Sequence, residues 1–300
     1  MDYAEARVAF FQPRPAVVNA VPWSSPAREL RDALEPLATV HYWSEASSQA
    51  YASLGLDFLT GYVWSRSCVL GEPEGTVVAA AFGVFEAGAV VGLYDAARAA
   101  CSLPRMREAR ERGALAALRS ALGTAPAGVV EVAAALRRGV EAADLTARPL
   151  FAGLRSFPWP DDPLTAAWHG ATALRECRGD SHLAVCLTHG LTGLEADVLT
   201  ELWVGYETLT YTATRAWSPE AMAAAVEGLR GRGLLQGEQL SEQGRALREQ
   251  VERDTDRAMS AVLDAVGDDL ADVVSRSVGW GAQLIAAGSF PPDPYKRAAG

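Results

Sequence analysis

The sequence predicts a mainly α-helical protein that carries one small β-hairpin in its C-terminal half. Apolar residues recur at helical spacing from Pro26 onward. No segment of the first 150 residues alternates apolar and polar side chains as half-buried strands do. In the second half, two helical patterns flank a short polar turn at Gly237, which is the predicted hairpin.

The first 25 residues are predicted to form an arm that packs across a neighbouring surface or subunit. Pro13, Pro15 and Pro22 punctuate this segment, and its aromatic and branched side chains are too apolar to stay in water. From Pro26 onward, a stripe of leucines at positions 30, 34 and 37 predicts an amphipathic helix. We therefore expect the helical part to begin at residue 26.

Further helices are predicted across the rest of the N-terminal half. Ser44 is a candidate N-cap, because its hydroxyl can accept a backbone N–H of the first turn, and the helix that follows ends at Gly55. The long apolar run Thr76–Tyr94 is predicted as one buried central helix, since Glu86 and several glycines argue against a membrane span. The other predicted helices in this half are 56–67, 104–122 and 128–143.

The segment between Trp159 and His189 is predicted to form two helices that meet at Gly179. Asp162 can cap the first helix, and Pro163 suits its first turn because a proline there loses no hydrogen bond. Gly179 can adopt the left-handed backbone that ends many helices. The second helix is expected to begin at His182, so this corner should bring polar side chains together.

The remaining pattern is typical of a winged helix-turn-helix domain. A helix over Gly193–Trp203 precedes a second helix that Ser218 and Pro219 begin as N-cap and first residue. An Arg-Gly-Leu-Leu step at 232–235 and a Leu-Ser step at 240–241 then frame a small β-wing. A long helix follows and is expected to run to about Val266.

Length and composition agree with two domains. The 300 residues are 49% hydrophobic and can bury a large core. We expect an arm over 1–25, a helical domain over 26–157, and a winged-helix-like domain with long C-terminal helices over 158–300. Scattered cysteines and an N-terminus without a basic-then-apolar leader predict a cytoplasmic protein with reduced thiols and no membrane partner.

Histidines and carboxylates gather in the predicted corner, where three of the four histidines lie between residues 159 and 189. Histidine beside glutamate suits proton transfer near neutral pH, and arginine suits an anionic group on a ligand. We predict a pocket between the two halves, with His169, Glu176 and His182 as catalytic residues. The predicted ligand-binding residues are His41, Tyr42, Tyr51, Arg66, Phe82, Trp168, Arg175 and Asp180.

Two stretches resemble known families. Residues 218–257 resemble the winged helix of MarR-type regulators, in which a basic-Gly-Leu-Leu step precedes a wing and an LTxxGR helix. Residues 28–287 resemble a family of actinobacterial proteins that carries a helix-turn-helix label. The resemblance rests on a W-H-x-A-T-x-L-R-E-x-R-G-D-x-H motif from Trp168 to His182, and it extends upstream to His41-Tyr42, Tyr51 and Arg66.

The chain departs from this family in its apolar run. The family usually has Phe-Tyr-Asn-Phe where this chain has Phe82-Gly83-Val84-Phe85. If these side chains line a pocket, the exchange enlarges it and makes it more apolar. The resemblance then implies a ligand different from that of the relatives.

Several functional interpretations stay open. The first is a small-molecule-binding protein, in particular an enzyme of specialised metabolism that performs acid–base chemistry on a small anionic substrate. The second is a MarR-like, ligand-responsive transcription regulator that acts as a homodimer. The third is a metalloprotein, although no motif requires a cofactor; its divalent metal would be held by His41, His169, Glu176 and His182. A fourth is that the corner is a buried polar network that joins the domains.

The composition argues against DNA as a partner. The net charge is −10, whereas a protein that binds phosphates carries a basic face. The predicted recognition helix, Pro219–Gly228, is mostly alanine with two glutamates and offers almost nothing to a base edge. The remaining candidate DNA contacts are Arg215, Arg230 and Arg232.

Overall fold

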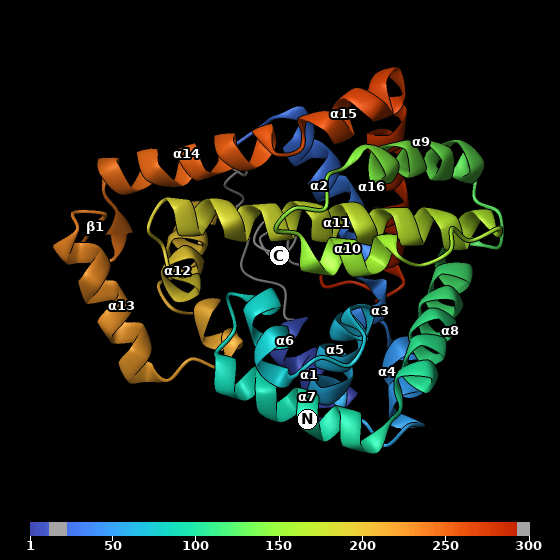
Figure 1. Cartoon of the computed structure of the whole chain (residues 1–300), viewed down its shortest axis with the longest axis horizontal. Helices are drawn as coiled ribbons and strands as arrows, with labels where there is room; N and C mark the ends of the chain where they lie inside the picture. The colour runs from blue at the N-terminus through green and yellow to red at the C-terminus, as the bar shows by residue number, and fades with distance from the viewer. Residues whose placement is uncertain (12–22, 293–300) are drawn as a thin grey trace.

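The computed structural model describes residues 1–11 and 23–292 and confirms the predicted mainly α-helical fold with a small β-wing. Its axis is α11 (Pro163–Thr188), a helix of 26 residues that crosses the middle of the molecule (Figure 1). In the described ranges, no helix is long and apolar enough to cross a membrane.

Helices fill the N-terminal half, and hydroxyl caps begin several of them. The Ser25 and Ser44 hydroxyls accept backbone N–H groups of their first turns at 3.1 and 3.2 Å, as the Ser44 cap was predicted to do. The elements are α1 (Tyr3–Phe10), α2 (Pro26–Ala38), α3 (Val40–Trp43), α4 (Glu45–Ala52), α5 (Phe58–Ser67), η1 (Cys68–Leu70), α6 (Gly75–Phe82), α7 (Ala87–Ala100), α8 (Leu103–Leu122), α9 (Val129–Ala142) and α10 (Pro149–Arg155).

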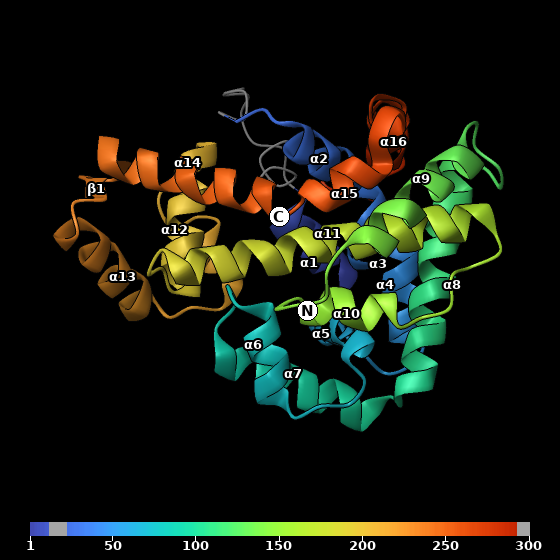
Figure 2. The same cartoon turned by 45° about the horizontal axis from the view of Figure 1, so that its top comes forward.

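The C-terminal half holds the predicted winged helix. Leu235 and Leu240 lie opposite each other in its antiparallel hairpin, and Figures 1 and 2 both place this hairpin at the far end of the molecule from α8. The elements after α11 are α12 (Gly193–Val204), η2 (Thr212–Arg215), α13 (Pro219–Gly231), β1 (Leu235–Gln236), β2 (Gln239–Leu240), α14 (Glu242–Arg257), α15 (Ser260–Val266), η3 (Gly267–Asp269) and α16 (Leu270–Ala286).

The predicted break at Gly179 is wrong, because α11 continues through it to Thr188. Glycine in a helix costs only about 1 kcal/mol relative to alanine. Burial of α11 against α2, α9, α10 and α14 outweighs that cost. Asp180 does not cap a second helix, since its carboxylate accepts the Phe151 backbone N–H at 3.0 Å.

Two other predicted helices are each divided in the structure. The run Thr76–Tyr94 was expected to be one helix, but α6 ends at Gly83, whose φ is +64°, and Glu86 caps α7 by accepting two backbone N–H groups. The long helix expected to reach Val266 is interrupted at Met259, between α14 and α15. Both errors have the same cause, since apolar spacing alone does not show where a chain turns.

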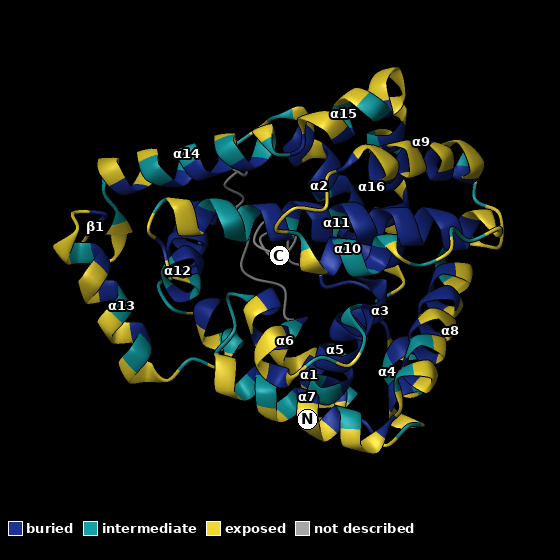
Figure 3. Ribbon diagram, in the orientation of Figure 1, coloured by how far each residue is buried: buried dark blue, intermediate teal, exposed yellow. Residues whose placement is uncertain are grey.

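The described chain has one large hydrophobic core, a smaller one, and a third cluster of four residues, Trp203, Val204, Tyr206 and Tyr211. The large core takes residues from α2 through Cys177 of α11 and then again from α15 and α16. The smaller core runs from Cys186 to Val251 and lies inside the winged helix. Figure 3 shows α11 buried along most of the large core. The cores therefore divide near residues 186 and 251, and the expected domain boundary at 157/158 stays a prediction.

The described part of the N-terminal arm folds back on the helical half of the same chain. Phe10 stacks on Phe58 at 5.8 Å between ring centroids, and the Tyr3 hydroxyl donates a hydrogen bond to the Trp43 carbonyl at 2.9 Å. The prediction of the arm also rested on Pro13, Pro15 and Pro22, which lie outside the described residues.

A close approach joins the α6–α7 loop to the winged helix. A Cβ added to Gly193 would lie 2.1 Å from the Gly83 carbonyl oxygen, which neither backbone can accommodate unchanged. We expect Gly193→Ala to lower the free energy of unfolding by about 1–3 kcal/mol in a urea titration. Gly279→Ala is the control: nothing lies within 4 Å of its Cβ, and we expect it to raise stability by about 0.5–1 kcal/mol. Equal effects would contradict the close approach.

Candidate functional site

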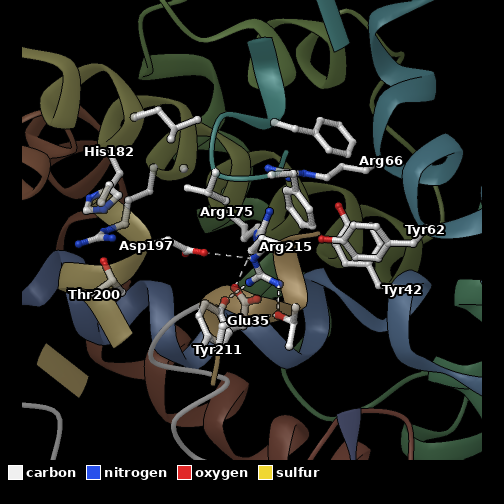
Figure 4. A pocket seen from close by; sticks show the side chains of 18 of the residues that line it. Glu35, Tyr42, Tyr62, Arg66, Arg175, His182, Asp197, Thr200, Tyr211 and Arg215 are labelled. Atoms are coloured by element: carbon white, nitrogen blue, oxygen red, sulfur yellow. Dashed lines mark hydrogen bonds and ion pairs between the residues drawn. The ribbon is translucent and has the colours of Figure 1, made fainter. Parts of the chain in front are cut away.

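A cavity of about 170 Å³ lies where the helical half meets the winged helix. Its lining comes from both sides of the junction, mainly from α2, α3, α5, α6 and the loop after it, α11, α12, η2 and α14. Figure 4 shows His182, Asp197 and Thr200 on one side, with Tyr42 and Tyr62 opposite. The position agrees with the predicted pocket between the two halves.

One side of the cavity is an aromatic wall, made of Tyr42, Tyr62, Phe82 and Phe85. The Tyr42 and Tyr62 ring centroids are 4.8 Å apart, and those of Phe82 and Phe85 are 5.9 Å apart. Three of these residues come from the segments Tyr42 and Phe82–Phe85, which the sequence had already marked. Such a wall suits an aromatic or apolar part of a ligand.

Arginines dominate the polar lining of the cavity. Among the described lining residues, seven arginines face three carboxylates. The carboxylates are Glu35, Asp197 and Glu252, and the arginines are Arg28, Arg31, Arg66, Arg175, Arg178, Arg215 and Arg248. An excess of guanidinium groups favours an anion.

Glu176 lies beneath the lining and anchors two of the arginines. Its carboxylate accepts two hydrogen bonds from Arg66, both 3.1 Å, one from Arg175 at 2.9 Å and one from the Tyr42 hydroxyl at 3.2 Å. Burial disfavours the charged form, but Arg66 and Arg175 outweigh it and lower the pKa of Glu176 to about 2. Glu176 is therefore a fixed anion and not a proton acceptor near neutral pH.

Glu252 of α14 makes a second anchor at what we term the arginine end of the cavity, formed by Arg28, Arg178 and Arg248. Its carboxylate pairs with these residues at 3.3, 2.5 and 2.8 Å. Despite burial, the three guanidinium groups hold the pKa of Glu252 well below its usual range. This carboxylate therefore ties α14 of the winged helix to α2 and α11.

Two guanidinium groups at the arginine end keep a buried donor without a partner. In the described residues, neither Nε of Arg178 nor Nη1 of Arg248 finds a hydrogen-bond acceptor. Their side chains are only 7% and 3% exposed. A buried donor left unpaired costs about 1–3 kcal/mol, and more when it is charged. These atoms are therefore candidate contacts for an anionic ligand.

Asp197 of α12 is the carboxylate of the cavity whose charge is not fixed. It is 5% exposed, and among the described residues no group donates it a hydrogen bond. The nearest cation is Arg215, with Nε 3.9 Å from Oδ2. Burial raises the pKa of Asp197 to about 7, and Arg215 only partly opposes the shift. The sequence analysis missed Asp197, although an acid inside the apolar run from Leu194 to Trp203 could have marked it.

The raised pKa of Asp197 predicts a pH-dependent stability difference. The folded state keeps the Asp197 proton that the unfolded state loses near pH 3.8, so the wild-type protein loses stability as pH rises from about 4 through 7. We expect Asp197→Asn to gain about 4 kcal/mol relative to wild type over that interval, measured by denaturant titration at each pH. A pH-independent difference would contradict the assignment.

The structure does not bring the four predicted metal ligands together. His41 lies beside Trp168, with ring centroids 5.7 Å apart, and His169 lies against Trp159 at 5.3 Å. Of the three predicted histidines, His182 is the one that lines the cavity. No group of three His, Cys, Asp or Glu side chains within residues 1–11 and 23–292 could hold a metal ion, so the predicted metal site is wrong.

The histidines are also unsuited to the predicted acid–base role. Burial and nearby arginines lower the pKa of His182 to about 3 and that of His169 to about 4. His182 Nδ1 lies 3.1 Å from the Thr255 hydroxyl, and among the described residues no carboxylate forms a hydrogen bond with this ring. His169, Glu176 and His182 therefore do not form the predicted catalytic group. The three side chains leave α11 in different directions, and each contacts different residues.

The predicted ligand-binding residues fall into two groups. Tyr42, Arg66, Phe82 and Arg175 line the cavity as expected. The other four lie elsewhere: the Tyr51 hydroxyl donates to the His41 carbonyl at 2.8 Å, the Trp168 ring packs under Arg110 at 4.6 Å, and Asp180 binds the α10 backbone. The cavity residues that sequence reasoning missed are mainly the arginines of α2 and α14 and the acids Glu35 and Asp197.

The candidate DNA contacts are engaged within the chain. Arg215, a candidate DNA contact in the sequence, lines the cavity and donates a hydrogen bond to the Tyr211 hydroxyl. Arg230 donates to the Gly237 carbonyl at 3.0 Å, and Arg232 pairs with Glu195 at 3.1 Å. The exposed face of α13 is formed by Glu220, Ala223, Ala224, Glu227 and Gly228, which offer no donor to a base edge.

Comparison with known proteins matches the chain to a family whose description is "helix-turn-helix family", over residues 27–291. Comparisons with curated proteins and with solved structures gave no match. The matched span includes the wing and nearly all of the cavity lining described above. The chain therefore belongs to a helix-turn-helix family.

Proposed function

We propose that this protein binds a small organic anion with an aromatic or apolar body in the cavity between its helical half and its winged helix. One observation carries the proposal: Arg178 and Arg248, each of which keeps a buried guanidinium donor without a partner among the described residues, line the same cavity as the aromatic wall. An anionic group would satisfy those donors, and a ring would cover the wall. The winged helix then serves as one side of a binding site.

Three probes of one shape and different charge test the proposal. In isothermal titration at pH 8, we expect 2-naphthoate to bind with one site per chain and about 10- to 100-fold more tightly than the neutral 2-naphthamide. The cationic 2-naphthylmethylamine should bind most weakly, because the lining arginines repel it. Equal affinity for all three probes, or no binding of any, would contradict the proposal.

A matched pair of variants locates the binding. Arg178→Gln removes a guanidinium group from the arginine end, and we expect it to weaken 2-naphthoate binding about tenfold or more. Arg245→Gln makes the same chemical change at an exposed position of α14 and should leave the affinity unchanged. If both variants bind like wild type, the anion does not bind at the arginine end.

The family supports a second candidate, a ligand-responsive regulator of the MarR type that binds DNA as a homodimer. Its support is the helix-turn-helix match together with the helix, wing and helix order of α13, β1, β2 and α14. Against it stands the exposed face of α13, which lacks base-contacting side chains. A mobility-shift assay with the upstream region of its own gene separates the two candidates. A salt-sensitive shift that 2-naphthoate alters would favour the regulator.

A further inference from the structure

Asp197 and Glu201 lie four residues apart on α12, and their hydrogen bonding differs. Glu201 accepts hydrogen bonds from the backbone N–H groups of Leu209, Tyr211 and Thr212, so it fixes the loop before α13. Asp197 has no such role, since none of the described residues donates it a hydrogen bond. Glu201 is thus a structural carboxylate, whereas Asp197 has an ion pair with Arg215 at 3.9 Å and accepts no hydrogen bond from the described residues.

Asp197 is also part of the wall of the cavity. It lines the cavity between Arg215 and Thr200, as Figure 4 shows. The Arg215 Nε is 3.9 Å from Oδ2, which is too far for a hydrogen bond. The Thr200 hydroxyl accepts the Arg248 Nε–H at 3.2 Å, and among the described residues it donates no hydrogen bond to Asp197. A buried carboxylate in this position keeps its full capacity to accept a hydrogen bond from a bound molecule.

We propose that the ligand of this cavity carries a hydroxyl group that donates a hydrogen bond to Asp197, which makes Asp197 a specificity-determining residue. This inference rests on the proposed binding of an organic anion. A hydroxyl fits better than an ammonium group, because seven arginines line the same cavity and repel a cation. The ligand class is therefore a hydroxylated aromatic carboxylate or a similar hydroxylated organic anion.

The test compares 2-naphthoate with its 5-, 6- and 7-hydroxy derivatives, whose hydroxyl groups lie on the ring away from the carboxylate. We expect at least one of these derivatives to bind wild-type protein about 10- to 100-fold more tightly than 2-naphthoate, since a hydrogen bond to a charged acceptor gives a gain of that size. Asp197→Asn should reduce that gain to about threefold or less, with the gain measured against 2-naphthoate bound to the same variant.

Asp264→Asn is the control, since it makes the same change at an exposed position outside the cavity, and it should keep the full gain. If 2-naphthoate binds but no hydroxy derivative gains affinity in wild-type protein, the inference about Asp197 is overturned and the anion site stands. The inference is also overturned if Asp197→Asn keeps the full gain. Failure of 2-naphthoate to bind at all overturns the proposed function instead. The comparison of probes in wild-type protein decides the matter even if Asp197→Asn does not fold.

Discussion

Glu176→Gln is expected to lower the free energy of unfolding by about 3–5 kcal/mol, as removal of one partner from a buried ion pair does. The substitution keeps the shape of the side chain and removes its charge. Arg66 then loses the carboxylate that it contacts with two hydrogen bonds, and Arg175 loses its closer partner. Denaturation by urea at pH 7 measures the loss.

Glu141→Gln is the matched control for this prediction. Glu141 pairs with Arg137 at 2.7 Å, but both side chains are more than half exposed, so we expect a loss below about 1 kcal/mol. The pH dependence gives an independent check. Because the folded pKa of Glu176 is depressed, its contribution is complete above pH 4.5 and is lost as pH falls toward 2. A Glu176 variant no less stable than the control would show that the buried pair contributes little.

Glu252→Gln is expected to cost a similar amount, about 3–5 kcal/mol, and to loosen the winged helix in particular. Glu252 carries the charge that Arg28 of α2, Arg178 of α11 and Arg248 of α14 share. Without it, guanidinium groups repel one another across the junction. Hydrogen exchange should therefore accelerate more in α14 than in α9, which lies in the large core.

The control for Glu252→Gln lies on the same helix. Glu242 is exposed in the first turn of α14, where a carboxylate contributes about 0.3–1 kcal/mol through the helix dipole. Glu242→Gln should therefore change exchange rates only near the start of α14. If the two variants give the same exchange pattern, Glu252 does not hold the winged helix against the helical half.

Most of the fold could be predicted because capping residues and first-turn prolines mark where many helices begin. Asp162 and Ser218 each accept a backbone N–H of the first turn and precede a proline, and both helices begin where predicted. Gly179 and Gly83 show the limit of such signals. Both are glycines in helical patterns, yet Gly179 stays inside α11 while Gly83 turns the chain. Contacts with distant parts of the chain decide whether a glycine stays in a helix or ends it. Such contacts cannot be predicted from local patterns in a single sequence.

The candidate site was predicted in its position and only partly in its residues. Arg66 and Arg175 were correctly placed at the cavity, since an aromatic or acidic neighbour marked each of them in the sequence. Arg248 and Asp197 were not, because each joins the site through a contact with a different element, Arg248 with Thr200 of α12 and Asp197 with Arg215 of η2. The histidines were predicted as site residues because they are few and lie close together in the sequence. In the structure, the polar side chains of the cavity are mainly arginines and carboxylates.

The most direct test of a binding site at the junction is a crystal structure of the protein with 2-naphthoate. We predict the carboxylate within hydrogen-bond distance of Arg178 or Arg248, with the rings against the aromatic wall of Tyr42, Tyr62, Phe82 and Phe85. A cavity without the probe, or a probe bound at a different surface with the arginine end unchanged, would contradict the proposed binding site.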